Sequence, residues 1–257
     1  MDVKENVFEI VNTAAYQQPT KESAALFNAA LAGSSSGVQS AIKAGGKVNY
    51  YHRPEAQQCA LHVAAEAGSL EVCEVLLENG ALVNALAATN KDMPLALAAA
   101  GGHDKVVDLL LSKGADVHHT NCYGNTALMM AAKHHAEGCI KSLLEAGSDI
   151  HAKNNKGSTP LLLACYEEDL PKGMMGGVKL PPVFKQLTDA GADVNVTDNR
   201  GATPLIAACG AGIDELITFL LDAGANPKVK EEGGLGPLAM AEFHKKKLSK
   251  KVVDRLK

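Results

Sequence analysis

A repeat of about 33 residues is the feature that most constrains how this chain of 257 residues can fold. One leucine recurs at intervals of 35, 34, 33, 33, 44 and 33 residues, at Leu26, Leu61, Leu95, Leu128, Leu161, Leu205 and Leu238. A glycine recurs in phase with it, at Gly45, Gly80, Gly114, Gly147, Gly191 and Gly224. Because a fixed period of roughly 20 to 50 residues is typical of stacked repeats, the sequence predicts an elongated solenoid.

Each unit carries the signals of two short helices. Thr203 and Pro204 begin one of them, since Thr caps a helix N-terminus and Pro at the first helical position lacks only a donor that the helix does not use. A second segment, such as 106–111, carries an aliphatic stripe, and the phased glycine follows where a helix C-terminus favours a left-handed residue. One unit cannot bury both of its faces, so the units must stack.

Composition and charge exclude several classes of function. Hydrophobic residues make up 46% of the chain but aromatic residues only 4%, which suits closely stacked helices better than one large core. The net charge of -4 provides no positive field for nucleic acid. No apolar run approaches the roughly 18 residues that a membrane-spanning helix needs. We therefore expect neither nucleic acid nor membrane as a partner, and a monomer when the chain is alone.

The cysteines indicate a reducing compartment. They are scattered, with no CxxC pair, at Cys59, Cys73, Cys122, Cys139, Cys165 and Cys209. Such a pattern is typical of small buried side chains rather than of disulfides. We expect a cytoplasmic location, with the nucleus as the alternative.

With these motifs the units resemble ankyrin repeats. The best copies of the family's pattern are 201–205 (GATPL) and 157–161 (GSTPL), while 59–62 (CALH) keeps the His but has lost Thr-Pro. The resemblance covers about residues 22–257. It implies an all-α ankyrin-repeat solenoid, in which helix-turn-helix units are joined by β-hairpin-like turns.

The phased markers give the domain organisation. We expect an N-terminal capping helix at residues 1–20 and an ankyrin-repeat domain of about seven repeats at 21–257. The interval of 44 residues reveals an insertion near 169–179, between the two helices of unit five. A basic capping helix is expected from Glu242 to Lys257; the alternative for this segment is a nuclear-import or anion-binding patch.

Catalytic and metal-binding patterns do not emerge from the sequence. There is no strand-turn-helix Ser motif and no phosphate-binding GxxxxGK[ST] motif, so we expect no enzyme, no catalytic residue and no cofactor. His135 and Cys139 are spaced i, i+4, and His118 and His151 occupy the same repeat position. A zinc site needs three or four converging ligands, which this spacing does not provide, so no metal site is expected.

The resemblance implies a binding surface on the concave face, formed by turn tips and by exposed positions of each first helix. Candidate partner-binding residues at the tips are Tyr50, Tyr51, Arg53, Asn90, Lys91, His119, Asn121, Tyr123, Asn155, Lys156, Asn199 and Arg200. Candidates on the first helices and in the insertion are Glu66, Lys133, His134, Tyr166, Glu167, Met174 and Met175. Tyr and Arg are frequent anchors of protein interfaces, and Met adapts to irregular apolar surfaces.

The sequence therefore predicts a scaffold or adaptor that binds another protein or peptide through its concave face. A first alternative is a regulatory inhibitor or assembly chaperone that masks a functional surface of its partner. A second alternative is a substrate of an ankyrin-directed Asn hydroxylase. Asn84 and Asn195 each follow a Val directly and a Leu by eight residues, which resembles the sites that such enzymes accept.

Overall fold

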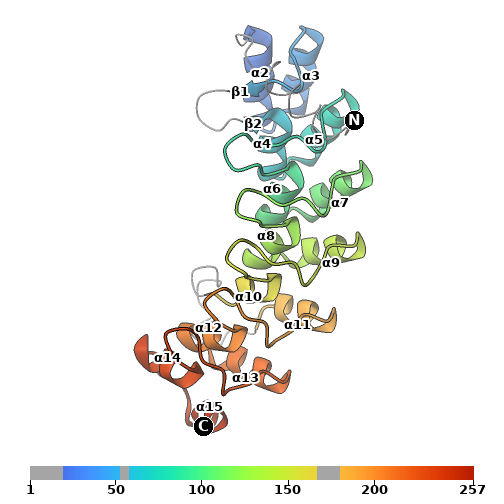
Figure 1. Cartoon of the computed structure of the whole chain (residues 1–257). Helices are drawn as coiled ribbons and strands as arrows, with labels where there is room; N and C mark the ends of the chain where they lie inside the picture. The colour runs from blue at the N-terminus through green and yellow to red at the C-terminus, as the bar shows by residue number, and fades with distance from the viewer. Residues whose placement is uncertain (1–19, 53–57, 167–179) are drawn as a thin grey trace, which may run out of the picture.

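The computed structural model describes residues 20–52, 58–166 and 180–257, in which seven helix pairs stack along one axis (Figure 1). The first helices of the units form one column: α2 (Lys21–Leu31), α4 (Ala60–Glu66), α6 (Pro94–Gly101), α8 (Ala127–Lys133), α10 (Pro160–Ala164), α12 (Pro204–Ala211) and α14 (Pro237–Phe243). The second helices are α3 (Ser35–Lys43), α5 (Leu70–Glu78), α7 (Asp104–Ser112), α9 (Glu137–Glu145), α11 (Pro182–Asp189), α13 (Asp214–Asp222) and α15 (Lys250–Leu256). No helix in this described part of the chain combines the length and apolar character needed to cross a membrane.

Threonine caps begin several of the first helices, as the Thr-Pro-Leu motif predicts. The side-chain oxygens of Thr126, Thr159 and Thr203 each accept the backbone N–H three residues further on, at 3.2, 3.4 and 3.2 Å. A cap of this kind satisfies one of the N–H groups that the first turn of a helix leaves without a partner. Each of these three helices therefore starts at a fixed point after the loop that precedes it.

Unit two replaces this cap with a buried Cys–His pair. Its loop forms a short antiparallel hairpin, β1 (Tyr51–His52) with β2 (Gln58–Cys59). The N–H of Cys59 donates to Nδ1 of His62 at 3.2 Å, so Nδ1 carries no proton. His62 Nε2 lies 3.2 Å from the carbonyl oxygen of Asp92 and must then be the donor. His62 is fully buried, and this hydrogen bond joins unit two to unit three.

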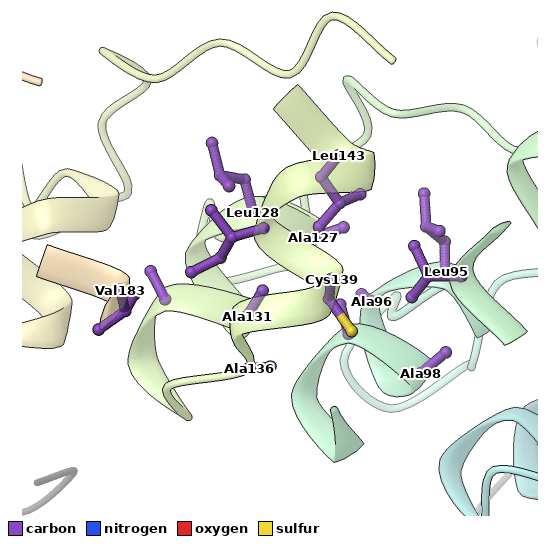
Figure 2. Packing of buried hydrophobic residues seen from close by; sticks show 14 of the residues in the cluster. Leu95, Ala96, Ala98, Ala127, Leu128, Ala131, Ala136, Cys139, Leu143 and Val183 are labelled. Carbon is purple, nitrogen blue, oxygen red and sulfur yellow. The ribbon is translucent and has the colours of Figure 1, made fainter. Parts of the chain in front are cut away.

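Closely packed small and aliphatic side chains form one continuous core along the stack. Figure 2 shows Leu95, Ala96 and Ala98 of α6 facing α8 and α9, which contribute Ala131, Leu128, Cys139 and Leu143, with Val183 of α11 beyond them. Leu128, Leu143 and Val183 are fully buried, as are Ala98, Ala131 and Cys139. The small residues let adjacent first helices approach, which brings the loops that precede those helices side by side.

The C-terminal segment differs from the single basic helix expected from Glu242 to Lys257. The structure has two helices there, because α14 ends at Phe243 and α15 begins at Lys250. Lys245 adopts a left-handed conformation with φ of 56°, which does not continue a right-handed helix. Ser249 caps α15 by accepting the Val252 N–H at 3.4 Å, and its own N–H donates to Asp214 Oδ2 at 2.9 Å.

We predict that Leu128→Ala lowers the free energy of unfolding by about 2–5 kcal/mol, because it leaves a cavity between α8 and its neighbours. Urea unfolding followed by circular dichroism measures this change. Lys105→Ala, at an exposed position of α7, is the control and should change stability by no more than about 0.5 kcal/mol. Equal stability of the two variants would contradict a core centred on this interface.

Candidate functional site

Loops that precede the first helices project beside the first-helix column, on the side away from the second helices (Figure 1). We call residues 84–92, 117–125, 150–158 and 194–202 the fingers. In the last three, one side-chain oxygen holds the tip closed by accepting two backbone N–H groups. Asn121 Oδ1 accepts from Tyr123 and Asn125, both at 3.0 Å, and Asn154 Oδ1 and Asp198 Oδ1 accept from the equivalent positions at 2.9–3.0 Å. The tips are therefore fixed turns.

Backbone hydrogen bonds join each fingertip to the next. In every case the acceptor is the carbonyl oxygen of the residue five positions before the phased leucine, and the donor is an N–H of the following unit. These bonds are Cys122 N to Asn90 O, Asn155 N to Tyr123 O, Asn199 N to Lys156 O and Glu232 N to Arg200 O, at 2.8, 3.0, 2.9 and 2.7 Å. Asn90, Tyr123, Lys156 and Arg200 consequently form a row, which we call the fingertip row.

The finger at 84–92 has a lysine where the next three have glycine. Lys91 adopts φ of 60°, whereas Gly124, Gly157 and Gly201 occupy the same turn position with φ of 76°. A residue with a Cβ is strained in this left-handed region. The carbonyl oxygen of Lys91 lies 2.8 Å from His119 Nε2, which fixes the finger against its neighbour.

Several predicted binding residues are exposed on this side of the molecule. Tyr123 is the most prominent, because 62% of its surface is exposed at a fingertip. Lys91 and Arg200 are exposed in their own fingers. Glu66 and His134 are exposed where α4 and α8 end, beside the half-buried Lys133, and Tyr50 is also half-buried. Fingertips and first-helix ends thus present accessible side chains that a partner could contact.

Tyr51 does not lie at an exposed tip, which corrects the prediction for this residue. It is 8% exposed and sits opposite Cys59 in the β1–β2 hairpin, with its ring centroid 6.3 Å from that of His62. Burial raises the pKa of the Tyr51 hydroxyl above its ordinary value. Neighbouring residues of a strand point to opposite faces, so Tyr51 faces the core while Tyr50 does not. Asn121, expected at an exposed tip, is also buried.

Three further candidates hold the scaffold together. Asn90 donates to the carboxylate of Asp92, and His119 contacts the Lys91 carbonyl oxygen. The Tyr166 hydroxyl donates to Asp198 Oδ2 at 3.1 Å, which ties the end of α10 to the finger of unit six. Burial raises the pKa of this hydroxyl.

Arg200 lies at the same contact. Its Nε is 3.6 Å from Asp198 Oδ2, and the hydrogen bond with Tyr166 and the charge of Asp198 raise its pKa. The guanidinium itself is exposed, while the Asp198 side chain is only 2% exposed. Arg200 therefore remains available at the fingertip even though its inner edge is held by Asp198.

Some predictions fall on residues that the structure does not describe. Arg53, Glu167, Met174 and Met175 lie outside the described ranges, as do nearly all of the expected N-terminal capping helix and the insertion at 169–179. Their binding roles stay predictions. The structure places the extra residues of the 44-residue interval between the two helices of unit five, because α10 ends at Ala164 and α11 begins at Pro182.

Burial raises the pKa of several core thiols, whereas His62 lowers the pKa of the buried Cys59 thiol. Burial raises the pKa of Cys139 to about 11 and those of Cys73 and Cys209 to about 12. A protonated thiol is a poor nucleophile and metal ligand. Among the described residues, no group of three or more His, Cys, Asp or Glu side chains is placed to hold a metal ion.

Sequence reasoning missed Asn154 and Asp198, and it assigned Asn121 to an exposed binding position rather than to closing the turn. Asn121, Asn154 and Asp198 each stand seven residues before the phased leucine, and that regularity is a signal that could have identified them. Lys153 was also missed. Its Nζ donates to the Thr197 carbonyl oxygen at 3.0 Å, so it links two fingers while remaining exposed.

Comparison with known proteins agrees with this architecture. A family model described as ankyrin repeats in three copies matches residues 3–87 and 95–172, and a single ankyrin-repeat model matches 200–232. Among solved structures, the human ASB11 ankyrin repeat domain superposes with a TM-score of 0.74 at 28% sequence identity, covering 90% of this chain and 96% of that one.

Curated relatives share only part of their length with this chain. The protein mask of Drosophila melanogaster, an ankyrin repeat and KH domain-containing protein, is 43% identical over 83 residues, which is 32% of this chain and 2% of that protein. Human ankyrin repeat and SOCS box protein 18 is 42% identical over 71 residues, which is 28% of this chain and 15% of that protein. The similarity thus lies in the repeats.

We predict that Tyr166→Phe lowers the free energy of unfolding by about 1.5 kcal/mol, because it removes a hydrogen bond to the buried carboxylate of Asp198. Tyr123→Phe is the matched control: the same hydroxyl is deleted from an exposed ring, and stability should not change measurably. Urea unfolding of both variants tests the difference. Equal stability of the two would show that the Tyr166 contact does not hold the finger.

We also predict that Lys91→Gly raises the free energy of unfolding by about 0.5–1 kcal/mol, because glycine relieves the left-handed strain at this turn. Lys105→Gly, near the start of α7, should instead lower it by about 1 kcal/mol through loss of helix propensity. Thermal and urea unfolding give both values. A loss of stability in both variants would rule out strain at Lys91.

Proposed function

Because this chain belongs to the ankyrin-repeat family, whose repeats generally mediate protein–protein interaction and are typically non-catalytic, we propose that it is a scaffold or adaptor that binds a partner protein along its fingers and first-helix ends. The observation that carries this proposal is Tyr123. Its large aromatic side chain is 62% exposed on a turn that hydrogen bonds within the finger and to the neighbouring fingers hold in place.

The rigidity of the fingers supports binding. Asn121 closes the tip on itself, and the Tyr123 carbonyl oxygen accepts the N–H of Asn155 in the next finger. A surface that is ordered before the partner arrives loses little conformational freedom on association. Exposed Tyr side chains on such surfaces are frequent centres of binding energy.

The first-helix ends extend the surface beyond the fingertips. Glu66 and His134 are exposed at equivalent ends of α4 and α8, and Lys133 is half-buried beside His134. A partner laid across fingers and helix ends would contact several units at once. Contacts spread over successive units are what a scaffold or adaptor requires.

A regulatory inhibitor or assembly chaperone would use this same surface, and the two roles differ only in the effect on the partner. A masking protein abolishes an activity of its partner when bound, whereas an adaptor leaves that activity intact. Assaying the partner with and without a saturating amount of this chain separates the two.

The hydroxylase-substrate alternative has a structural requirement of its own. Asn84 Nδ2 donates to the Gly114 carbonyl oxygen at 3.3 Å, and Asn84 Oδ1 accepts the Asp116 N–H at 2.9 Å. A hydroxylase would have to open both contacts to reach the side chain. Intact-mass measurement of the chain isolated from cells tests this alternative, because each hydroxylation adds one oxygen.

We predict that Tyr123→Ala combined with His134→Ala weakens binding of a captured partner at least about tenfold, as expected for loss of an interface centre. The control variant carries Lys105→Ala and Lys141→Ala on the second helices, where both side chains are exposed. Quantitative affinity capture, with circular dichroism to verify folding, measures the effect. Equal retention of the partner by the two variants would show that the binding surface lies elsewhere.

A further inference from the structure

The exposed charged side chains of the four fingers all have the same sign. They are Lys91, Lys153, Lys156 and Arg200. The two acidic residues of the fingers, Asp92 and Asp198, are 4% and 7% exposed. Asp92 accepts from Asn121 Nδ2 at 2.8 Å, and Asp198 accepts from Tyr166 and from backbone N–H groups. The surface of these four fingers is therefore positive, although the whole chain has a net charge of -4 and the next loop brings the exposed Glu232 beside Arg200.

Two second helices on the opposite side of the stack are acidic. Helices α5 and α13 each carry three acidic residues and no basic one. Acidic residues also stand just before three of the fingers, where Asp116, Asp149 and Asp193 each accept the N–H two residues further on at 2.8–3.0 Å. Acidic side chains thus lie on these two helices and at the finger bases, whereas the exposed charges of the four fingers are basic. Such polarity steers and orients an anionic partner.

We propose that the fingertips bind an acidic, extended segment of the partner protein. This proposal rests on the interaction surface proposed above and specifies the chemistry of the segment that binds there. Carboxylates of the segment pair with Lys156 and Arg200, and an apolar side chain packs on the ring of Tyr123. These three residues belong to the fingertip row, whose backbone hydrogen bonds hold them in register across units four to six. Lys91 and Lys153 extend the positive surface on either side of Tyr123.

The stacking distance gives the spacing of the acidic residues. Packed helices lie about 8–10 Å apart, which sets the step from one finger to the next. A polyproline II segment rises about 3.1 Å per residue with three residues per turn, so every third side chain faces the same way about 9 Å further on. Acidic residues three positions apart can therefore reach Lys156 and Arg200 on successive fingers.

A protein segment fits this surface better than a nucleic acid does. The net charge of -4 and the aspartates at the finger bases oppose a partner that carries a negative charge on every nucleotide. An acidic segment with uncharged residues between its carboxylates can place its charges on the fingertips alone. The probe set below includes an oligonucleotide for this reason.

The experiment uses the full chain and three labelled peptides of one length in fluorescence anisotropy at low salt. The first peptide has Glu at every third position among Pro and Ser, the second has the same composition with its Glu residues consecutive, and the third has Gln in place of Glu. We expect the first peptide to bind, the second to bind several-fold more weakly and the third not to bind. Affinity should fall with added salt, as charge pairing at a surface requires.

Charge-reversal variants locate the site. Lys153→Glu with Lys156→Glu should weaken the first peptide about tenfold, whereas Lys105→Glu with Lys141→Glu on the second helices should not weaken it. Circular dichroism and unfolding curves establish that both variants fold. A milder variant, Lys153→Gln with Lys156→Gln, should give an intermediate loss and serves in place of the reversal if that variant is unfolded.

Defined outcomes overturn the proposal. Equal binding of the Gln peptide, or tighter binding of a single-stranded oligonucleotide, would show that the fingers do not select an acidic protein segment. Equal binding of the two Glu isomers would refute the spacing of one carboxylate per finger. If a captured partner depends on Tyr123 and His134 while no Glu peptide binds, the acidic chemistry fails and the interaction surface stands. If that partner binds the Tyr123→Ala, His134→Ala variant as tightly as the unaltered chain, the proposed interaction surface is wrong.

Discussion

The apolar contact between neighbouring units is the interaction on which this structure depends. A helix such as α10, with 5 residues, or α8, with 7, is too short to be stable in water by itself. It persists because side chains such as Leu128 and Leu161 are fully buried between units. Small residues at the same interface let the helices approach, and that approach brings successive fingers within hydrogen-bond distance of each other.

Polar contacts then convert the stacked helices into an ordered surface. His62 of unit two reaches the backbone of Asp92 in unit three, and Tyr166 of unit five reaches the carboxylate of Asp198 in unit six. Each contact is buried or half-buried, where a hydrogen bond is shielded from competing water. Because these bonds cross from one unit to the next, the fingers are positioned by their neighbours as well as by their own turns.

Much of this could be predicted from sequence, because the period, the Thr-Pro starts and the glycine ends are local signals. The positions of the helix pairs followed from them. Whether the Tyr51 side chain faces the core or the solvent could not be predicted in the same way, since it depends on the pairing of Tyr51 with Cys59 across a hairpin. The Tyr166–Asp198 contact joins residues 32 positions apart, and the break between α14 and α15 depends on Asp214 from another unit.

The fingers separate the residues that build each turn from those that face outward. Asn121, Asn154 and Asp198 direct their side-chain oxygens to the backbone of their own loops. Tyr123 and Lys156 have exposed side chains, and their backbone carbonyl oxygens accept the hydrogen bonds from the next finger. A change of side chain at an outward position therefore leaves the turn and its inter-unit hydrogen bonds in place. On the proposed interaction surface, the residues that recognise a partner can therefore be exchanged one finger at a time while the fold is kept.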